Sequence, residues 1–270
     1  MDVLHFVEFV LLGFGVGAIG TLIGAGGGFI LLPVLLMLYP DKSPESLTSI
    51  SLAVVFINST SGSLAYSRLK RIDYRSGRAF ALATLPGAIM GAYTTKYIQR
   101  DSFDILLGLV LMGLALFLFL KPQYQTRSLI TRTYRVLRKL TDSEGTTYSW
   151  SFNMATGISI SFVVGFLSSL LGIGGGIIHV PVLTTLLHFP VPIATATSHF
   201  ILAIMSLAGT GAHLAQGNLN ATWPLVLALG TGVVAGAQLG AWISHRTRPE
   251  WIVRVLAVSL FAVGIRLLWL

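Results

Sequence analysis

The chain has 270 residues, 54% of them hydrophobic and only 10% charged, and its mean hydropathy is +0.78. Soluble domains usually carry about 25% charged residues, so this composition excludes an ordinary soluble fold and indicates a protein of the lipid bilayer. The formal net charge of +8 comes from short basic clusters between apolar segments, which is typical of loops on the inner side of a membrane and argues against nucleic-acid binding.

The first part of the chain, residues 1–120, contains a series of apolar segments that we expect to form membrane helices. A helix that crosses the hydrocarbon core needs about 20 predominantly apolar residues, and several of the segments reach that length. They lie near residues 3–23, 28–39, 46–67, 79–98 and 103–120.

A polar stretch, residues 121–150, follows this first part. It contains only two acidic residues, Asp142 and Glu144, against a larger number of basic ones. We therefore predict a basic linker on the cytoplasmic side. Its basic residues are Lys121, Arg127, Arg132, Arg135, Arg138 and Lys139.

The last part, residues 151–270, is apolar again. Between Glu144 and Arg246 there is no Asp, Glu, Lys or Arg, and such a stretch is long enough for several membrane helices. We predict a second transmembrane repeat here, matching a first repeat in residues 1–120. Its apolar segments lie near residues 151–171, 176–189, 193–215, 222–244 and 252–270.

Three motifs of the first repeat return in the same order in the second, which indicates a duplicated unit. The sequence GAGGGFILLP at 24–33 corresponds to GIGGGIIHVP at 172–181. Thr48-Ser49 corresponds to Thr197-Ser198, and the small-residue run 87–92 to 232–237. Glycines spaced by four residues, as in these runs, allow helices to approach closely in lipid, so packing is the first interpretation of the later glycines.

The distribution of basic residues predicts that the two repeats have opposite orientations. The loop from Arg68 to Arg78, the linker and the loop that begins at Arg246 are basic and should be cytoplasmic, whereas the loop from His213 to Thr222 carries no formal charge. Inversion requires an odd number of crossings per repeat. The two glycine-flanked segments of each repeat must then form either two crossings or a hairpin that returns to its own side. A parallel four-plus-four arrangement would place one basic loop on the wrong side.

The predicted fold is therefore an all-α polytopic membrane protein with two inverted repeats of about four to five hydrophobic segments each, in which the first helix of each repeat is broken at the glycines. As one helix, residues 3–39 would span about 55 Å, well beyond a hydrocarbon core of about 30 Å. Glycine permits the backbone turn, and Pro33 and Pro181 limit a straight continuation.

A broken helix within a membrane exposes backbone N–H groups and the positive end of a helix dipole, which together suit an anion. We expect such a site at Gly26, Gly27 and Gly28 and again at Gly174, Gly175 and Gly176. Inverted repeats would bring the two breaks toward one central site, as in transporters.

Hydroxyl and amide side chains near the breaks are the other candidates for substrate binding, because the apolar core segments offer no charged residue. Serine and threonine in membrane helices often bond to their own helix instead. His179 and His199 fit a proton-linked switch, an oxyanion donor or packing equally well. The favoured binding residues are Thr48, Ser49, Asn58, Thr197, Ser198 and His199, with Ser51, Ser59, Ser61 and Thr195 as further candidates.

An enzymatic function is not expected. The glycine run follows no strand and lacks an acidic residue about 20 positions later, so it does not match a dinucleotide fingerprint. Ser198 and His199 are adjacent, so on one helix they point about 100° apart and cannot pair as nucleophile and base. Cysteine is absent, and we expect no cofactor and no metal. A passive anion channel remains the alternative to a carrier.

The paired sequences GAGGGFILLPVL and GIGGGIIHVPVL, each followed by a Thr-Ser helix start, resemble the TauE/SafE sulfite exporter family over nearly the whole chain apart from the linker. The resemblance implies a multi-pass inner-membrane permease whose partners are the lipid bilayer and a small sulfur-containing anion such as sulfite, sulfoacetate or another organosulfonate. The sequence departs from the family pattern at His199, where the first repeat has Ile50. Coupling ion, direction of transport and oligomeric state do not follow from the sequence.

Overall fold

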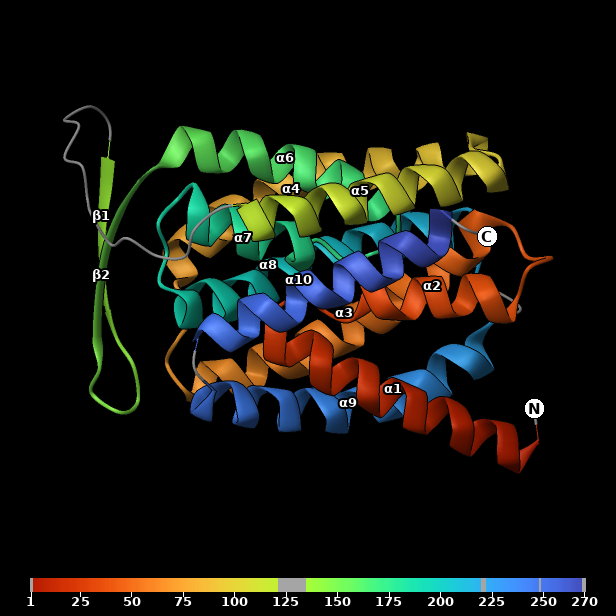
Figure 1. Ribbon diagram of the computed structural model, residues 1–270, viewed down its shortest axis with the longest axis horizontal. Coiled ribbons are helices and arrows are strands. Elements are labelled where there is room, and N and C mark those ends of the chain that lie inside the picture. Colours follow the sequence, from red (N-terminus) through yellow and green to blue (C-terminus); the bar gives the residue numbers. More distant parts are fainter. Residues whose placement is uncertain (1, 121–134, 220–221, 248, 269–270) are drawn as a thin grey trace.

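The computed structural model describes residues 2–120, 135–219, 222–247 and 249–268, and these form a bundle of helices with a β-hairpin at one end (Figure 1). The first repeat contains the helices α1 (Val3–Ile23), α2 (Gly28–Leu38), α3 (Pro44–Arg68), α4 (Tyr74–Thr94) and α5 (Arg100–Leu120), with the short 3₁₀ helix η1 (Thr95–Tyr97) before α5. The hairpin consists of β1 (Arg135–Thr141) and β2 (Thr147–Asn153). The second repeat contains α6 (Met154–Leu170), α7 (Gly176–Thr185), α8 (Val191–Ala215), α9 (Trp223–Arg246) and α10 (Pro249–Leu268).

The helices confirm the prediction of an all-α membrane protein. Four of them are long and apolar enough to cross a bilayer by length and composition, namely α1, α3, α8 and most of α9, and shorter apolar helices accompany them. Large apolar side chains on the outside of the bundle, such as Leu4, Leu82 and Leu116, are 68%, 65% and 57% exposed, as expected for a surface that faces lipid rather than water.

The chain turns back on itself at each glycine run. α1 starts at the end of the molecule opposite the β-hairpin, and α2 returns to that end (Figure 1). There the Arg100 guanidinium donates to the carbonyls of Leu36 and Lys42, at 2.7 and 3.0 Å, and so joins the end of α2 to the start of α5.

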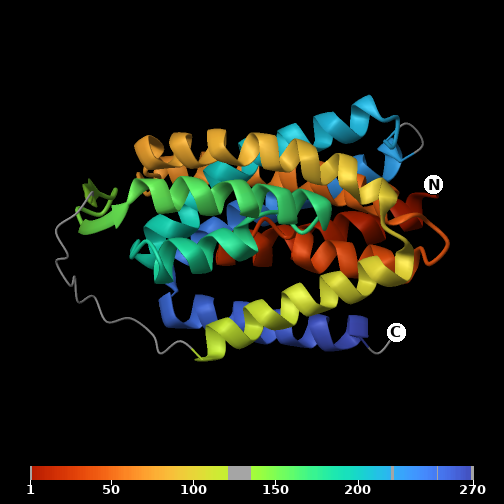
Figure 2. The same cartoon turned by 90° about the horizontal axis from the view of Figure 1, so that it is seen from above.

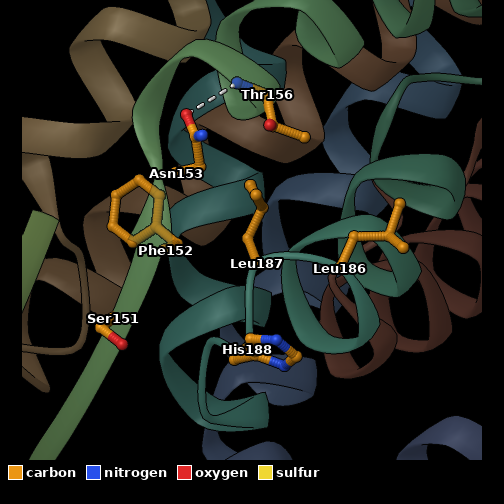
Figure 3. A pocket seen from close by; sticks show the side chains of 7 residues that line it. All are labelled: Ser151, Phe152, Asn153, Thr156, Leu186, Leu187 and His188. Atoms are coloured by element: carbon orange, nitrogen blue, oxygen red, sulfur yellow. Dashed lines mark hydrogen bonds between the residues drawn. The ribbon is translucent and has the colours of Figure 1, made fainter. Parts of the chain in front are cut away.

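α6 and α7 form the corresponding hairpin at the other end of the molecule. The end of β2, the start of α6 and the residues that follow α7 line a small cavity of about 100 Å³, shown in Figure 3 with residues Ser151, Phe152, Asn153, Thr156, Leu186, Leu187 and His188. Of the two arrangements that the sequence left open for the glycine-flanked segments, the structure therefore has the returning hairpin in both repeats.

Helices of the two repeats pack against each other in reciprocal pairs. α1 lies along α9 and α4 along α6, while α3 contacts α8. α5 and α10 lie side by side along one flank (Figure 2). The predicted packing role of the later glycines is confirmed: a side-chain carbon at Gly91 would collide with the carbonyl oxygen of Phe166, and one at Gly240 with that of Ala18.

Two tightly packed glycine pairs correspond by position, although the sequence paired them differently. Gly87 and Gly91 contact successive turns of α6, and Gly236 and Gly240 contact the equivalent turns of α1. The sequence motifs matched Gly87 with Gly232 instead. The sequence alone is ambiguous here, because α9 carries three glycines at four-residue spacing. The glycine pair of α4 can therefore be aligned with either the first two or the last two of them.

Part of the predicted linker forms the antiparallel hairpin β1–β2, with Arg135 opposite Asn153. Residues 121–134 lie outside the described residues. The hairpin is held by a buried ion pair in which the Arg71 guanidinium contacts Asp142 Oδ2 at 3.1 Å. Figures 1 and 2 place the hairpin at the end of the molecule away from both termini. The loop containing Arg71 and the end of α9 lie at the same end of the molecule as the hairpin. The described parts of the three basic segments that were predicted to be cytoplasmic are therefore at one end.

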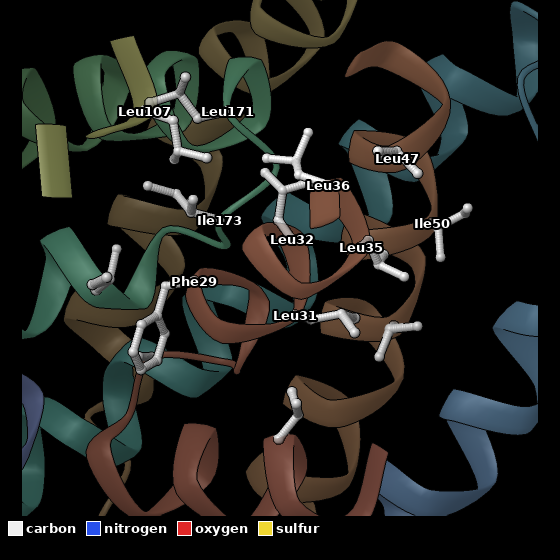
Figure 4. Packing of buried hydrophobic residues seen from close by; sticks show 14 of the residues in the cluster. Phe29, Leu31, Leu32, Leu35, Leu36, Leu47, Ile50, Leu107, Leu171 and Ile173 are labelled. Atoms are coloured by element: carbon white, nitrogen blue, oxygen red, sulfur yellow. The ribbon is translucent and has the colours of Figure 1, made fainter. Parts of the chain in front are cut away.

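The largest apolar cluster surrounds α2 (Figure 4). Phe29, Leu32 and Leu36 of α2 pack with Leu107 of α5 and with Leu171 and Ile173 of the second glycine run, and all of them are buried. In lipid the gain comes from close packing rather than from removal of water, so the cluster holds α2 firmly under the break. It anchors one side of the site described next.

Candidate functional site

The first break lies between α1 and α2 and depends on a left-handed backbone. Gly24, Gly26 and Gly27 have φ angles of 86°, 77° and 82°, a region that side-chain-bearing residues rarely adopt. The carbonyl of Gly20 accepts the N–H groups of Ala25 and Gly26, at 2.8 and 3.1 Å, which closes the end of α1. Among the described residues, the N–H groups of Gly27, Gly28 and Phe29 find no acceptor.

The second break repeats this design between α6 and α7, with φ angles of 62° at Gly172 and 70° at Gly174. Gly175 differs, since its φ of −59° is helical. Within the described chain, the N–H groups from Gly174 to Ile177 find no acceptor. Those of Gly176 and Ile177 belong to the first turn of α7 and point back along its axis toward the break.

The two breaks cross each other in direct backbone contact. A side-chain carbon on Gly28 would lie 2.6 Å from the carbonyl oxygen of Ile173, and one on Gly176 would collide with the carbonyl oxygen of Gly24. Residues 23–29 and 171–181 are all buried. The predicted glycines Gly26, Gly27, Gly28, Gly174, Gly175 and Gly176 are thus brought together at one place.

Hydroxyl groups join each break to the helix of the other repeat. Ser51 Oγ of α3 donates to the carbonyl of Gly172 at 2.6 Å, and Ser198 Oγ of α8 donates to the carbonyl of Gly24 at 3.0 Å. One helical turn earlier, Thr48 packs against Gly172 and Thr195 against Gly24. Each repeat therefore offers a Thr-x-x-Ser pair to the break of the other.

This pairing shifts the correspondence expected from the sequence. The two Thr-Ser dipeptides were matched by their letters, but α7 has 10 residues where α2 has 11, so Thr48 and Ser51 take the places of Thr195 and Ser198. Ser49 instead bonds to the carbonyl of Ser46 at 2.7 Å, toward the end of the bundle opposite the hairpin. Thr197 accepts the N–H of Asp73 at 3.0 Å, at the hairpin end. The structure does not bring either residue to the breaks.

Asn58 and His199 belong to a buried polar network on α1. Thr21 Oγ1 donates to Asn58 Oδ1 at 3.2 Å and lies 3.2 Å from His199 Nε2. Tyr66 donates to the carbonyl of Thr21 at 2.7 Å, and its ring meets that of His199 edge-on. Because the Thr21 hydrogen is directed to Asn58, His199 Nε2 acts as the donor to Thr21. This network links α8 of the second repeat to α1 and α3 of the first.

Sequence reasoning missed Thr21, Tyr66 and the pair Ser168-Ser169. A signal was present: a hydroxyl side chain stands three residues, or about one helical turn, before the first glycine of each run, at Thr21 and at Ser169. The other hydroxyl candidates, Ser59 and Ser61, differ. Ser59 is buried and has no hydrogen-bond partner among the described residues, whereas Ser61 donates to the carbonyl of Val234 at 3.0 Å.

Several buried polar atoms around the breaks have no hydrogen-bond partner within the described part of the chain. Such atoms are uncommon in folded proteins, because each costs about 1–3 kcal/mol when it is left unpaired. Together with the unbonded N–H groups, they concentrate unpaired polar atoms around the two breaks. They are Thr48 Oγ1, Asn58 Nδ2, Ser59 Oγ, Ser168 Oγ, Ser169 Oγ, His179 Nδ1, Thr195 Oγ1 and His199 Nδ1.

Comparisons with known proteins agree with this architecture. The sequence profile of the sulfite exporter TauE/SafE family matches residues 9–267. The probable membrane transporter protein YunE of Bacillus subtilis is 35% identical to this chain over 98% of both proteins. A probable membrane transporter protein of Methanocaldococcus jannaschii is 26% identical over 96% of this chain and 94% of its own length.

A plant relative matches only part of the chain. Sulfite exporter TauE/SafE family protein 5 of Arabidopsis thaliana is 30% identical over 36% of this chain and 21% of its own length. No solved structure matches this chain. Because the family profile extends over nearly all of the helices described above, the chain belongs to the sulfite exporter TauE/SafE family and is a membrane transporter rather than an enzyme.

Proposed function

We propose that this protein is a secondary transporter of the cell (inner) membrane for small sulfur-containing oxyanions such as sulfite or organosulfonates. The observation that carries the proposal is the pair of crossed breaks, at which two helix starts present unbonded N–H groups to one buried place. The family name supports the substrate class, since it is given for sulfite exporters.

The polarity of the site favours an anion that is held weakly enough to leave again. The residues of the two breaks carry no formal charge. A carboxylate would be expected at a cation site, and a lysine or arginine at a site that holds an anion tightly. Backbone N–H groups and hydroxyls can instead replace the water around an oxyanion without a fixed countercharge.

The mechanism we propose is alternating access between two inverted repeats, residues 1–120 and 151–270, with the linker 121–150 between them. The reciprocal contacts support it, because Ser51 and Ser198 tie each repeat to the break of the other. Gly27, Gly28, Gly175 and Gly176 would supply the close backbone approach. Thr48 and Ser198 would orient the oxyanion together with Thr195 and Ser51, which replace Ser49 and Thr197 in this role.

Flux measurements in proteoliposomes test the function. We expect saturable uptake of sulfite or sulfoacetate, and counterflow when the same anion is preloaded inside, with taurine and acetate as controls. Flux that does not saturate and shows no counterflow would instead identify an anion channel. Absence of flux for every sulfur oxyanion would refute the proposed substrate class.

A further inference from the structure

The two breaks differ in the polar side-chain atoms beside them, and the difference is found next to Gly175. Its counterpart by position in the glycine run is Gly27. The three atoms nearest to a side-chain carbon at Gly27 would all belong to Val16, with Cγ1 at 2.7 Å and the carbonyl oxygen at 2.8 Å. A side-chain carbon at Gly175 would meet three different side chains: Met205 Sδ at 3.0 Å, Ser168 Oγ at 3.1 Å and His179 Nδ1 at 3.2 Å.

Two of these three atoms are buried polar atoms without a partner. Ser168 and His179 are 0% and 1% exposed, and neither Ser168 Oγ nor His179 Nδ1 has a hydrogen-bond partner within the described residues. They come from α6 and α7 and converge on the same point, beside the unbonded N–H groups of Gly176 and Ile177. In the first repeat the matching positions are Gly20 and Leu31, which offer no polar side-chain atom.

The contact of His179 Nε2 with Ser161 is compatible with a hydrogen on His179 Nδ1, which would make Nδ1 a donor. Ser161 Oγ lies 3.3 Å from His179 Nε2. When the serine hydroxyl donates to Nε2, the ring hydrogen is on Nδ1 and faces Ser168 and Gly175. Two side-chain donors and two backbone donors then surround one place, which is the arrangement that an oxyanion requires.

We infer that the oxyanion binds at the second break, in a cradle formed by Ser168 Oγ, His179 Nδ1 and the first N–H groups of α7, with Met205 as its apolar wall. This assignment rests on the proposed transport of sulfur oxyanions and deepens it. The first break supports the second through backbone contact, and its own N–H groups are not part of this cradle. With the breaks in contact, a side-chain carbon at Gly175 would already lie 3.0–3.2 Å from the three lining atoms, so the cradle is closed and the anion enters when the repeats separate.

Equilibrium binding to the purified full-length protein tests the assignment, with sulfite, sulfate and sulfoacetate titrated by calorimetry. Because hydrogen bonds to a charged group are the strong ones, we expect Ser168→Ala and His179→Leu each to weaken binding at least ~10-fold. His179→Asn keeps a donor near the place of Nδ1 and should retain more affinity than His179→Leu. Ser206→Ala is the matched control, since Ser206 Oγ bonds to the carbonyl of Leu202 in its own helix.

Gly175→Ala gives a second test that does not depend on the histidine variant being stable. The helical φ of Gly175 accepts alanine, and the three atoms nearest to the added methyl group belong to side chains that can shift slightly, so the fold should persist while the cradle is filled. We expect loss of anion binding with an unchanged melting temperature of the free protein.

The outcomes separate this inference from the function on which it rests. Unchanged affinity in Ser168→Ala, His179→Leu and Gly175→Ala would overturn the cradle while leaving anion transport intact. A loss of binding in Ser59→Ala equal to that in Ser168→Ala would also overturn it, because Ser59 Oγ lies 3.2 Å from the side-chain position of Gly26 at the first break. Binding of none of the three anions by the unchanged protein would refute the proposed function itself.

Discussion

Asp142→Asn should loosen the β-hairpin from the helical bundle. The carboxylate accepts Arg71 Nε and Nη2 at 3.3 and 3.1 Å through Oδ2, and the N–H groups of Glu144 and Thr146 at 3.0 Å each through Oδ1. The side chains of Arg71 and Asp142 are 6% and 0% exposed, so the variant leaves a buried guanidinium without its counterion.

The size of the effect follows from the burial of the pair. Removing one partner of a buried ion pair typically costs about 3–5 kcal/mol. Glu144 Oε2 lies 3.6 Å from Arg71 Nη2 and stays in place, so we expect the lower end, about 3 kcal/mol. Since each 1.4 kcal/mol is a factor of ten, amide exchange in the hairpin should become roughly 100-fold faster.

Hydrogen exchange followed by mass spectrometry measures this for peptides that cover β1 and β2. Glu144→Gln, which neutralises the half-exposed neighbour instead, is the control and should change exchange little. A double-mutant cycle with Arg71→Gln decides the cause. If Asp142→Asn costs as much without the guanidinium as with it, the ion pair is not what holds the hairpin and the reasoning is refuted.

The same carboxylate predicts how the hairpin responds to acid. Burial by itself would raise the pKa of Asp142, but the N–H groups of Glu144 and Thr146 and the Arg71 guanidinium together lower it below its usual value of 3.8. A group whose pKa is lowered by folding contributes stability above its unfolded pKa, and that contribution is lost as the pH falls below about 3.8. After correction for the intrinsic pH dependence of amide exchange, the protection of β1 and β2 should therefore fall in this range in the unchanged protein and not in Asp142→Asn.

Three further predictions concern the crossed breaks and the polar network that contains His199. Gly176→Ala places a methyl group against the carbonyl of Gly24, so we expect a loss of flux together with a lower melting temperature; wild-type values of both would contradict the backbone contact. Ser51→Ala should reduce flux several-fold, whereas Ser49→Ala should not, and equal effects in proteoliposomes would remove the distinction between the two serines. His199→Ala should change the pH dependence of transport, and an identical profile would assign the residue to packing alone.

The helical segments and the places of the helix breaks could be predicted from the sequence because they depend on local properties. Apolar length defines a membrane helix, and the run from Gly24 to Gly28 defines where it must end. The returning course of α2 could not be predicted, since it depends on contacts with other helices, such as the bonds from Arg100 to the carbonyls of Leu36 and Lys42. The hairpin was missed because a basic linker and a short amphipathic β-ribbon have similar composition.

The candidate site shows the same division. The glycines were found by their repetition, but the choice among hydroxyls required knowing which face of a helix meets the break. Ser49 and Ser51 are equally polar in the sequence, and only the direction of α3 distinguishes them. His179 lies within the second glycine motif and Ser168 precedes it, but their convergence on Gly175 exists only in three dimensions.

The backbone contacts of Gly28 with Ile173 and of Gly176 with Gly24 have a consequence for how the protein can be assembled. Each interrupted helix is covered in part by the other repeat, so a polypeptide ending near the linker would expose peptide groups of its break to hydrocarbon. We expect the first repeat to remain in the translocation machinery or bound to a chaperone until the second repeat has been synthesised. Two separately encoded fragments should regain function only when they are produced in the same cell.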